Sequence, residues 1–100
     1  MTTPGKALHP GKILKKKFMA PHNLSATALA LALRVAPNRM TNIVRGRRGV
    51  TAETAIRLAL YFRNTPEYWL GLQTAFEIGK AEKENGAKIR KQVIPRGSNL

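Results

Sequence analysis

Residues 25–49 read SATALALALRVAPNRMTNIVRGRRG, and this stretch decides the fold. Ser25 is a good N-cap for a helix to about Leu33, and leucines four residues apart form its inner face. After a short break, Pro37 takes the first position of a second helix that runs to about Val44. The stretch therefore predicts two short helices separated by three residues.

Two helices of this length, joined by such a break, have the dimensions of a helix-turn-helix. The motif needs a small residue where the helices cross, and Ala30 occupies that position. It needs an apolar residue after the turn, which is Val35, and apolar contacts from the second helix to the core, which Met40 and Ile43 provide. The sequence thus predicts a helix-turn-helix over these residues.

The second helix of the motif carries polar side chains that its periodicity turns outward. These are Asn38, Arg39 and Asn42, with Thr41 at the flank. Asparagine can pair with the adenine edge and arginine with the guanine edge in the major groove of DNA. We therefore expect these four residues to contact bases.

Phosphate contacts are expected on both sides of that helix. Ser25 and Thr27 lie at a helix start, where phosphate is attracted, although the two residues can also serve only as a cap and its first turn. Arg45, Arg47 and Arg48 follow the second helix in a glycine-containing loop, where backbone phosphates pass. The run Lys15 to Lys17 is consistent with a solvated helix face or with a further phosphate contact.

Arg34 occupies the turn position before Val35, where a positive φ is usual and glycine is favoured. A non-glycine residue in that conformation costs about 1 kcal/mol, which a packed domain can absorb. Alternatively, the turn has a different geometry, and Asn38 and Arg39 shift relative to the groove.

Three further helices are expected, which makes the domain an all-α bundle of five helices. They run from Pro10 to Pro21 with His9 as cap, from Thr51 to Phe62, and from Thr65 to about Lys88. Their expected buried residues are Ile13, Leu14, Phe18, Ala55, Leu58, Ala59, Phe62, Trp69, Leu72 and Phe76. We expect one domain over residues 9–90, with flexible ends at 1–8 and 91–100.

The charge of the chain restricts its partners. The 100 residues carry 18 Lys and Arg against 5 acids, a net charge of +13, and no acid precedes Glu53. Such a chain favours polyanions such as nucleic acid. The chain has no cysteine, no apolar run that could span a membrane and no signal-peptide pattern at its start, so we expect a cytoplasmic bacterial protein, nucleoid-associated when bound to DNA.

An enzyme is not expected. Aspartate and cysteine are absent, and the serines have no plausible His–acid partners. The two glycines between Arg45 and Gly49 lack the strand and the Lys-Ser/Thr ending of a P-loop. His9 and His22 are too isolated to form a metal site, and we expect no cofactor.

Several separated blocks resemble the HigA-type antitoxins, also called virulence-associated protein I, over roughly residues 8–90. The blocks are HPGKIL (9–14), Leu24-Ser25, Ala28–Ala30, NIVRGRRGVTAETA (42–55) and PEYWLGLQ (66–73). The resemblance implies a lambda-repressor-like, Cro-like fold with an additional C-terminal helix and a homodimer. It also implies binding to the operator of its own operon and neutralisation of a HigB-type mRNA-cleaving toxin. Arg34 departs from the family's turn glycine.

Other functions stay open at this level. The chain can be a stand-alone regulator, a toxin-binding module without specific DNA readout, or a nonspecific nucleic-acid binder. Tyr68, Leu70 and the rest of the last helix can form a dimer face or a toxin face. An mRNA-cleaving toxin is itself basic, so contact with it is expected through the acidic residues of the second half, Glu67, Glu77, Glu82 and Glu84.

Overall fold

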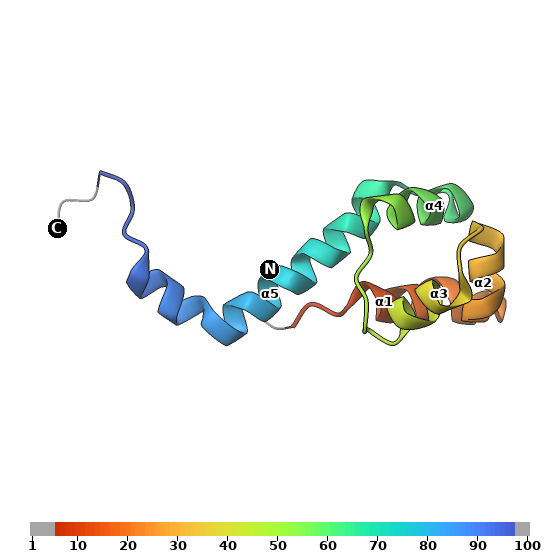
Figure 1. The fold of residues 1–100 in the computed structure, drawn as a ribbon, viewed down its shortest axis with the longest axis horizontal. Coiled ribbons are helices and arrows are strands. Elements are labelled where there is room, and N and C mark those ends of the chain that lie inside the picture. The colour runs from red at the N-terminus through yellow and green to blue at the C-terminus, as the bar shows by residue number, and fades with distance from the viewer. Residues whose placement is uncertain (1–5, 98–100) are drawn as a thin grey trace.

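The computed structural model describes residues 6–97, which fold into helices with no strand among them (Figure 1). The elements are α1 (Pro10–Ile13), η1 (Leu14–Met19), η2 (Ala20–His22), α2 (Ala26–Leu33), α3 (Pro37–Val44), α4 (Ala52–Phe62) and α5 (Pro66–Gln92). Because α1, η1 and η2 follow one another without a break, they form one helical segment. The expected all-α arrangement of five helical segments is confirmed.

The helices begin where the sequence places their start signals. The hydroxyls of Ser25, Thr51 and Thr65 accept hydrogen bonds from the backbone N–H three residues later, at 3.0, 3.4 and 3.1 Å. Pro37 and Pro66 stand at the starts of α3 and α5, where their missing N–H leaves no hydrogen bond unmade. These local features fix where α2, α3, α4 and α5 begin.

The first helical segment differs from the expected regular α-helix. Its middle, η1, is a π-helix, and η2 is a 3₁₀ turn around Pro21. In a π-helix, residues about five apart share a face. Leu14 and Met19 are accordingly both buried, whereas Phe18 is half-buried, so the helical period of 3.6 did not identify Met19 as a core residue.

Arg34 ends α2 in the left-handed conformation, with φ 62°. The N–H of Val35 donates to the Ala30 carbonyl at 3.0 Å, which closes the helix end in a Schellman arrangement. The turn thus keeps its positive-φ geometry, and the alternative of a different turn does not apply. Arg63 ends α4 in the same conformation, also with φ 62°.

We predict that Arg34→Gly stabilises the protein by about 0.5–1 kcal/mol. Glycine removes the cost of a Cβ in the left-handed region, and its greater freedom in the unfolded chain offsets part of that gain. Urea denaturation measures the difference. Arg34→Ala removes the same charge but keeps the Cβ, so an equal gain in that variant would contradict the explanation.

The core lies where η1, α2, α3, α4 and the start of α5 meet. Its buried apolar residues are Leu14, Met19, Leu29, Ala30, Leu33, Met40, Ile43, Val50, Ala55, Leu58, Ala59 and Trp69. Ala30 is fully buried, as a small residue at the crossing of the two motif helices should be. Phe62 and Leu72, expected in the core, are partly buried and pack against it.

The second helix of the motif, α3, approaches the first segment closely at Gly11. A Cβ at Gly11 would lie 1.8 Å from the backbone oxygen of Ile43 in α3. Only a residue without a side chain fits there, so α1 and α3 are held backbone against backbone. This contact sets the position of α3 within the domain.

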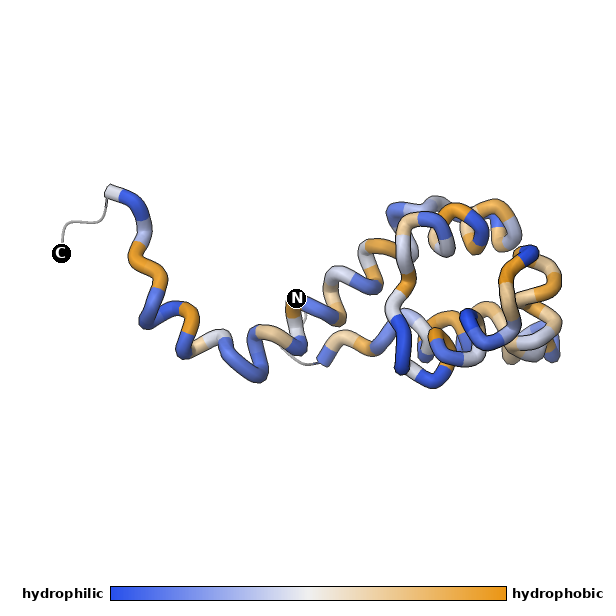
Figure 2. Tube along the Cα trace, viewed as in Figure 1, coloured by the Kyte–Doolittle hydropathy of each residue, from blue (hydrophilic) through white to orange (hydrophobic). Residues whose placement is uncertain are grey.

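The last helix, α5, continues well beyond the other helices (Figure 1). It reaches Gln92 rather than the expected Lys88, so residues 91–92 are helical and not part of a tail. Its outer half extends away from the other helices and includes hydrophobic residues (Figure 2), and the exposed fractions of Ile78 and Ile89 are 58% and 45%. Of the expected flexible ends, residues 1–5 and 98–100 lie outside the described residues. No helix within 6–97 is long and apolar enough to cross a membrane.

Candidate nucleic-acid interface

The outward side of α3 carries two amides without an intramolecular partner. Asn38 is exposed and Asn42 is half-buried, and neither side chain makes a hydrogen bond within residues 6–97. Unpaired amide groups on an accessible helix are available to pair with the edge of a base. This placement agrees with the expectation from the sequence.

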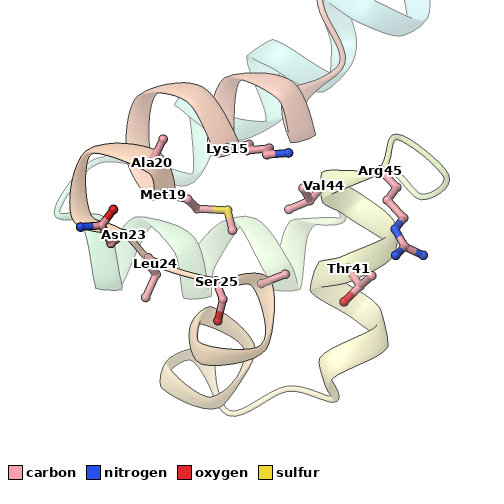
Figure 3. Close-up of a pocket in the computed structure, with 10 residues that line it drawn as sticks. Lys15, Met19, Ala20, Asn23, Leu24, Ser25, Thr41, Val44 and Arg45 are labelled. Atoms are coloured by element: carbon pink, nitrogen blue, oxygen red, sulfur yellow. The ribbon is translucent and has the colours of Figure 1, made fainter.

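Thr41 lies one turn along α3 and borders a groove between η1, the start of α2 and α3 (Figure 3). The groove has a volume of about 560 Å³, and Lys15, Ser25 and Arg45 also line it. Thr41 donates to the Pro37 carbonyl at 3.1 Å, which leaves its oxygen able to accept. Thr27 is exposed but does not border the groove.

The loop after α3 holds the expected phosphate-contacting arginines. Arg45, Arg47 and Arg48 are all exposed. The turn is fixed by Gly46, whose φ is 75°, and by a hydrogen bond of 2.8 Å from the Arg47 N–H to the Asn42 carbonyl. Three cationic side chains therefore stand on an ordered backbone directly beside the polar side of α3.

His9 joins this loop to the rest of the domain. As expected, it caps the first helix, because its Nδ1 accepts a hydrogen bond from the Gly11 N–H at 2.9 Å. The Arg48 backbone also interacts with the His9 ring. The ring also packs edge-on against Phe76 of α5, with the ring centroids 5.0 Å apart. His9 is 8% exposed, and this burial lowers its pKa, because it disfavours the charged ring. The interaction with the Arg48 backbone raises the His9 pKa and offsets part of this lowering.

We predict that stability falls as the pH drops below the ordinary histidine pKa of about 6.5. The pKa of His9 is lowered in the folded protein, so the neutral ring contributes stability above pH 6.5 that is lost as the pH falls through the folded pKa. In His9→Asn, an amide oxygen can replace Nδ1 as cap without titrating. Melting temperatures between pH 8 and 5 should therefore fall less in this variant. His22→Asn, at an exposed histidine, should keep the wild-type profile, and a flattened profile there would contradict the assignment.

Arg39, the third polar residue expected on the outward side of α3, is partly exposed and paired with an acid of α4. Its side chain is only 28% exposed, and its Nη1 donates to Glu53 Oε1 of α4 at 2.6 Å. Arg39 and Arg57 lower the pKa of the Glu53 carboxyl, chiefly through the Arg39 hydrogen bond. The sequence did not predict this ion pair, because Glu53 is 14 residues away and a helical repeat contains no information about it.

Two residues that support the site were not identified from the sequence. Gln73 is buried in α5, and its Oε1 accepts from the Val50 N–H at 2.8 Å, which anchors the end of the arginine loop. A Cβ at Gly49 would lie 2.8 Å from the Gln73 amide, so a side chain there would displace Gln73 from this contact. Arg57 of α4 donates from Nη1 to the Leu33 carbonyl at the end of α2, at 2.9 Å. These contacts span 23 or 24 residues and leave no periodic signal.

The chain matches a known family and several known proteins. The family model described as helix-turn-helix matches residues 14–70. Virulence-associated protein I of Dichelobacter nodosus is 49% identical over 78 residues, which cover 78% of this chain and 72% of the relative.

Two solved structures have the same fold. The antitoxin GraA in complex with its operator is 41% identical, with a TM-score of 0.89, and the match covers 98% of this chain and 99% of that chain. The Pseudomonas aeruginosa antitoxin HigA with higBA promoter is 37% identical, with a TM-score of 0.87, covering 90% and 98%. These names describe regulators rather than enzymes, in agreement with the expectation from the sequence. The chain belongs to the helix-turn-helix family of HigA-type antitoxins and virulence-associated protein I.

Proposed function

We propose that this protein is an operator-binding repressor of its own operon. Asn38, Arg39, Thr41 and Asn42 read base edges in the major groove, and Ser25, Thr27, Arg45, Arg47 and Arg48 hold phosphates. The main support for this proposal is the outward side of α3. There the amides of Asn38 and Asn42, which make no hydrogen bond within residues 6–97, lie beside an ordered cationic loop. The two related antitoxins solved with operator or promoter DNA support the same use of the fold.

The active form in this proposal is a homodimer. A two-fold dimer places its recognition helices about 34 Å apart, one turn of DNA, so the operator is palindromic. The outer half of α5 supports the dimer, because it exposes apolar residues that one protomer leaves uncovered. Tyr68 packs on Phe18 and Trp69, and Leu70 is partly buried, so neither presents a fully exposed contact.

The antitoxin role is the second part of the proposal. Relatives carry that name, and a HigB-type mRNA-cleaving toxin is the partner it requires. Of the acids suited to a basic toxin, Glu82 is paired with Arg90 at 2.7 Å, whereas Glu67, Glu77 and Glu84 are exposed on α5. Growth rescue by this protein during expression of a candidate HigB-type toxin gene, sought beside the gene for this protein, tests this part. If this protein neither rescues growth nor co-purifies with the toxin, the antitoxin role is wrong and the protein is a stand-alone regulator. In either role we expect it to work in the cytoplasm, at the nucleoid when it is bound to DNA.

A binding titration tests the DNA-binding part. Fluorescence anisotropy is measured with a duplex from the protein's own promoter and with a scrambled duplex, at two salt concentrations. An operator binder should prefer the promoter by about 10³-fold or more. Equal binding to both duplexes with a steep salt dependence would mean that the +13 charge alone explains the affinity, and the repressor proposal would be wrong.

A further inference from the structure

Glu53 occupies a particular place in the charge pattern of the chain. It is the first acid in the sequence and stands in the first turn of α4, within hydrogen-bond distance of Arg39 on α3. Its Oε1 accepts from Arg39 at 2.6 Å and lies 3.6 Å from Nε of Arg57. A carboxylate beside the proposed DNA-binding surface repels phosphate, so the presence of Glu53 at this position requires an explanation.

The ion pair contributes little as a stabilising contact. The side chain of Glu53 is 62% exposed, and exposed pairs are screened by water and salt. The position that this ion pair gives the Arg39 side chain is more informative than its contribution to stability. Arg57, which also contacts Glu53, donates to the Leu33 carbonyl, so the carboxylate links the end of α2 and the start of α4 to the Arg39 side chain on α3.

We propose that Glu53 is a positioning residue that orients Arg39 toward a base and thereby determines sequence specificity. The inference rests on the proposed repressor function. A guanidinium carries five N–H donors in a planar fork, and Glu53 is within hydrogen-bond distance of one nitrogen, Nη1. The remaining donors can pair with O6 and N7 of a guanine. An arginine already held in place loses less rotamer freedom on binding, and its paired charge attracts arbitrary phosphates less strongly.

The test is the specificity ratio, defined as scrambled-duplex Kd divided by promoter-duplex Kd. We expect Glu53→Gln to lower this ratio about tenfold. Promoter binding weakens, while scrambled-duplex binding stays equal or tightens because a negative charge is removed. In an Arg39→Ala background, Glu53→Gln should change the ratio less than about twofold, since the two residues act through one contact.

Glu67→Gln is the matched control. Glu67 lies in the first turn of α5, is exposed, and makes no ion pair within residues 6–97. Its substitution removes the same charge and should leave the ratio unchanged, because the contact proposed for Glu67 is with the toxin, which is absent from this titration. Thermal melts of all variants show whether the domain remains folded.

Two results would overturn the proposal while the wild type still prefers its promoter. The first is an unchanged specificity ratio in Glu53→Gln, which would mean that the ion pair has only a structural role. Promoter binding can instead tighten selectively, which means that Glu53 withholds Arg39 from DNA. If the wild type itself shows no preference, the repressor function fails, and the role of Glu53 fails with it.

Discussion

Gly11→Ala should destabilise the domain by about 3 kcal/mol, the upper part of the usual cost of overpacking. The added Cβ would lie 1.8 Å from the backbone oxygen of Ile43, and neither backbone can rotate away as a flexible side chain can. The first helical segment and α3 must therefore separate. A domain of this size has only a few kcal/mol to lose, so we expect it to lose cooperative folding at moderate temperature.

Urea and thermal denaturation measure this effect, and Gly71→Ala is the control. Gly71 is an exposed helical glycine of α5 whose Cβ would meet nothing within 4 Å. There alanine should stabilise the protein by about 0.5–1 kcal/mol through its helix propensity. If Gly11→Ala melts together with the wild type, the close packing of α1 on α3 is wrong.

The contacts that matter most for the site were the least accessible to sequence reasoning. Start signals such as Ser25, Thr51 and Thr65 are local, so the helix boundaries followed from the sequence. The close contact of Gly11 with the Ile43 backbone had no such signal, because a glycine in a sequence does not indicate which other segment packs against it. The ion pair of Arg39 was not predicted for a related reason, since its partner Glu53 belongs to another helix.

His9 lies between these two cases. Its capping role was expected, because it directly precedes the Pro10 start and the cap is local. Its contacts with Arg48 and Phe76 depend on the packing of the loop and α5 against the first helix, and were not expected. The sequence predicted a turn at Arg34 but left its backbone conformation open. The motif favours a positive φ at this position, whereas an arginine disfavours it.

Asn38→Ala is expected to have the largest effect on specificity without loss of stability. Asn38 is exposed and makes no hydrogen bond within the described chain, so its truncation leaves no buried group unsatisfied. Loss of a bidentate base contact removes about 1–3 kcal/mol of discrimination, a factor of roughly 5 to 150. Promoter affinity should fall by that factor, while scrambled-duplex affinity stays constant.

Arg47→Ala is the matched comparison for this prediction. Arg47 is exposed on the loop after α3, and its proposed partner is a phosphate, which carries no sequence information. Both duplexes should bind more weakly by a similar factor, and the salt slope should fall by about one unit. If Arg47→Ala abolished specificity while Asn38→Ala kept it, the roles assigned to α3 and the loop would have to be exchanged.

The most direct test of the account is an NMR titration of the labelled protein with its promoter duplex and with a scrambled duplex. With the promoter duplex, we expect large chemical-shift changes in the side-chain amides of Asn38 and Asn42 and in the backbone of residues 45–48. The scrambled duplex should not shift the two side-chain amides strongly. Shifts confined to the exposed lysines of η1 and to α5, and identical for both duplexes, would contradict the claim that α3 reads sequence.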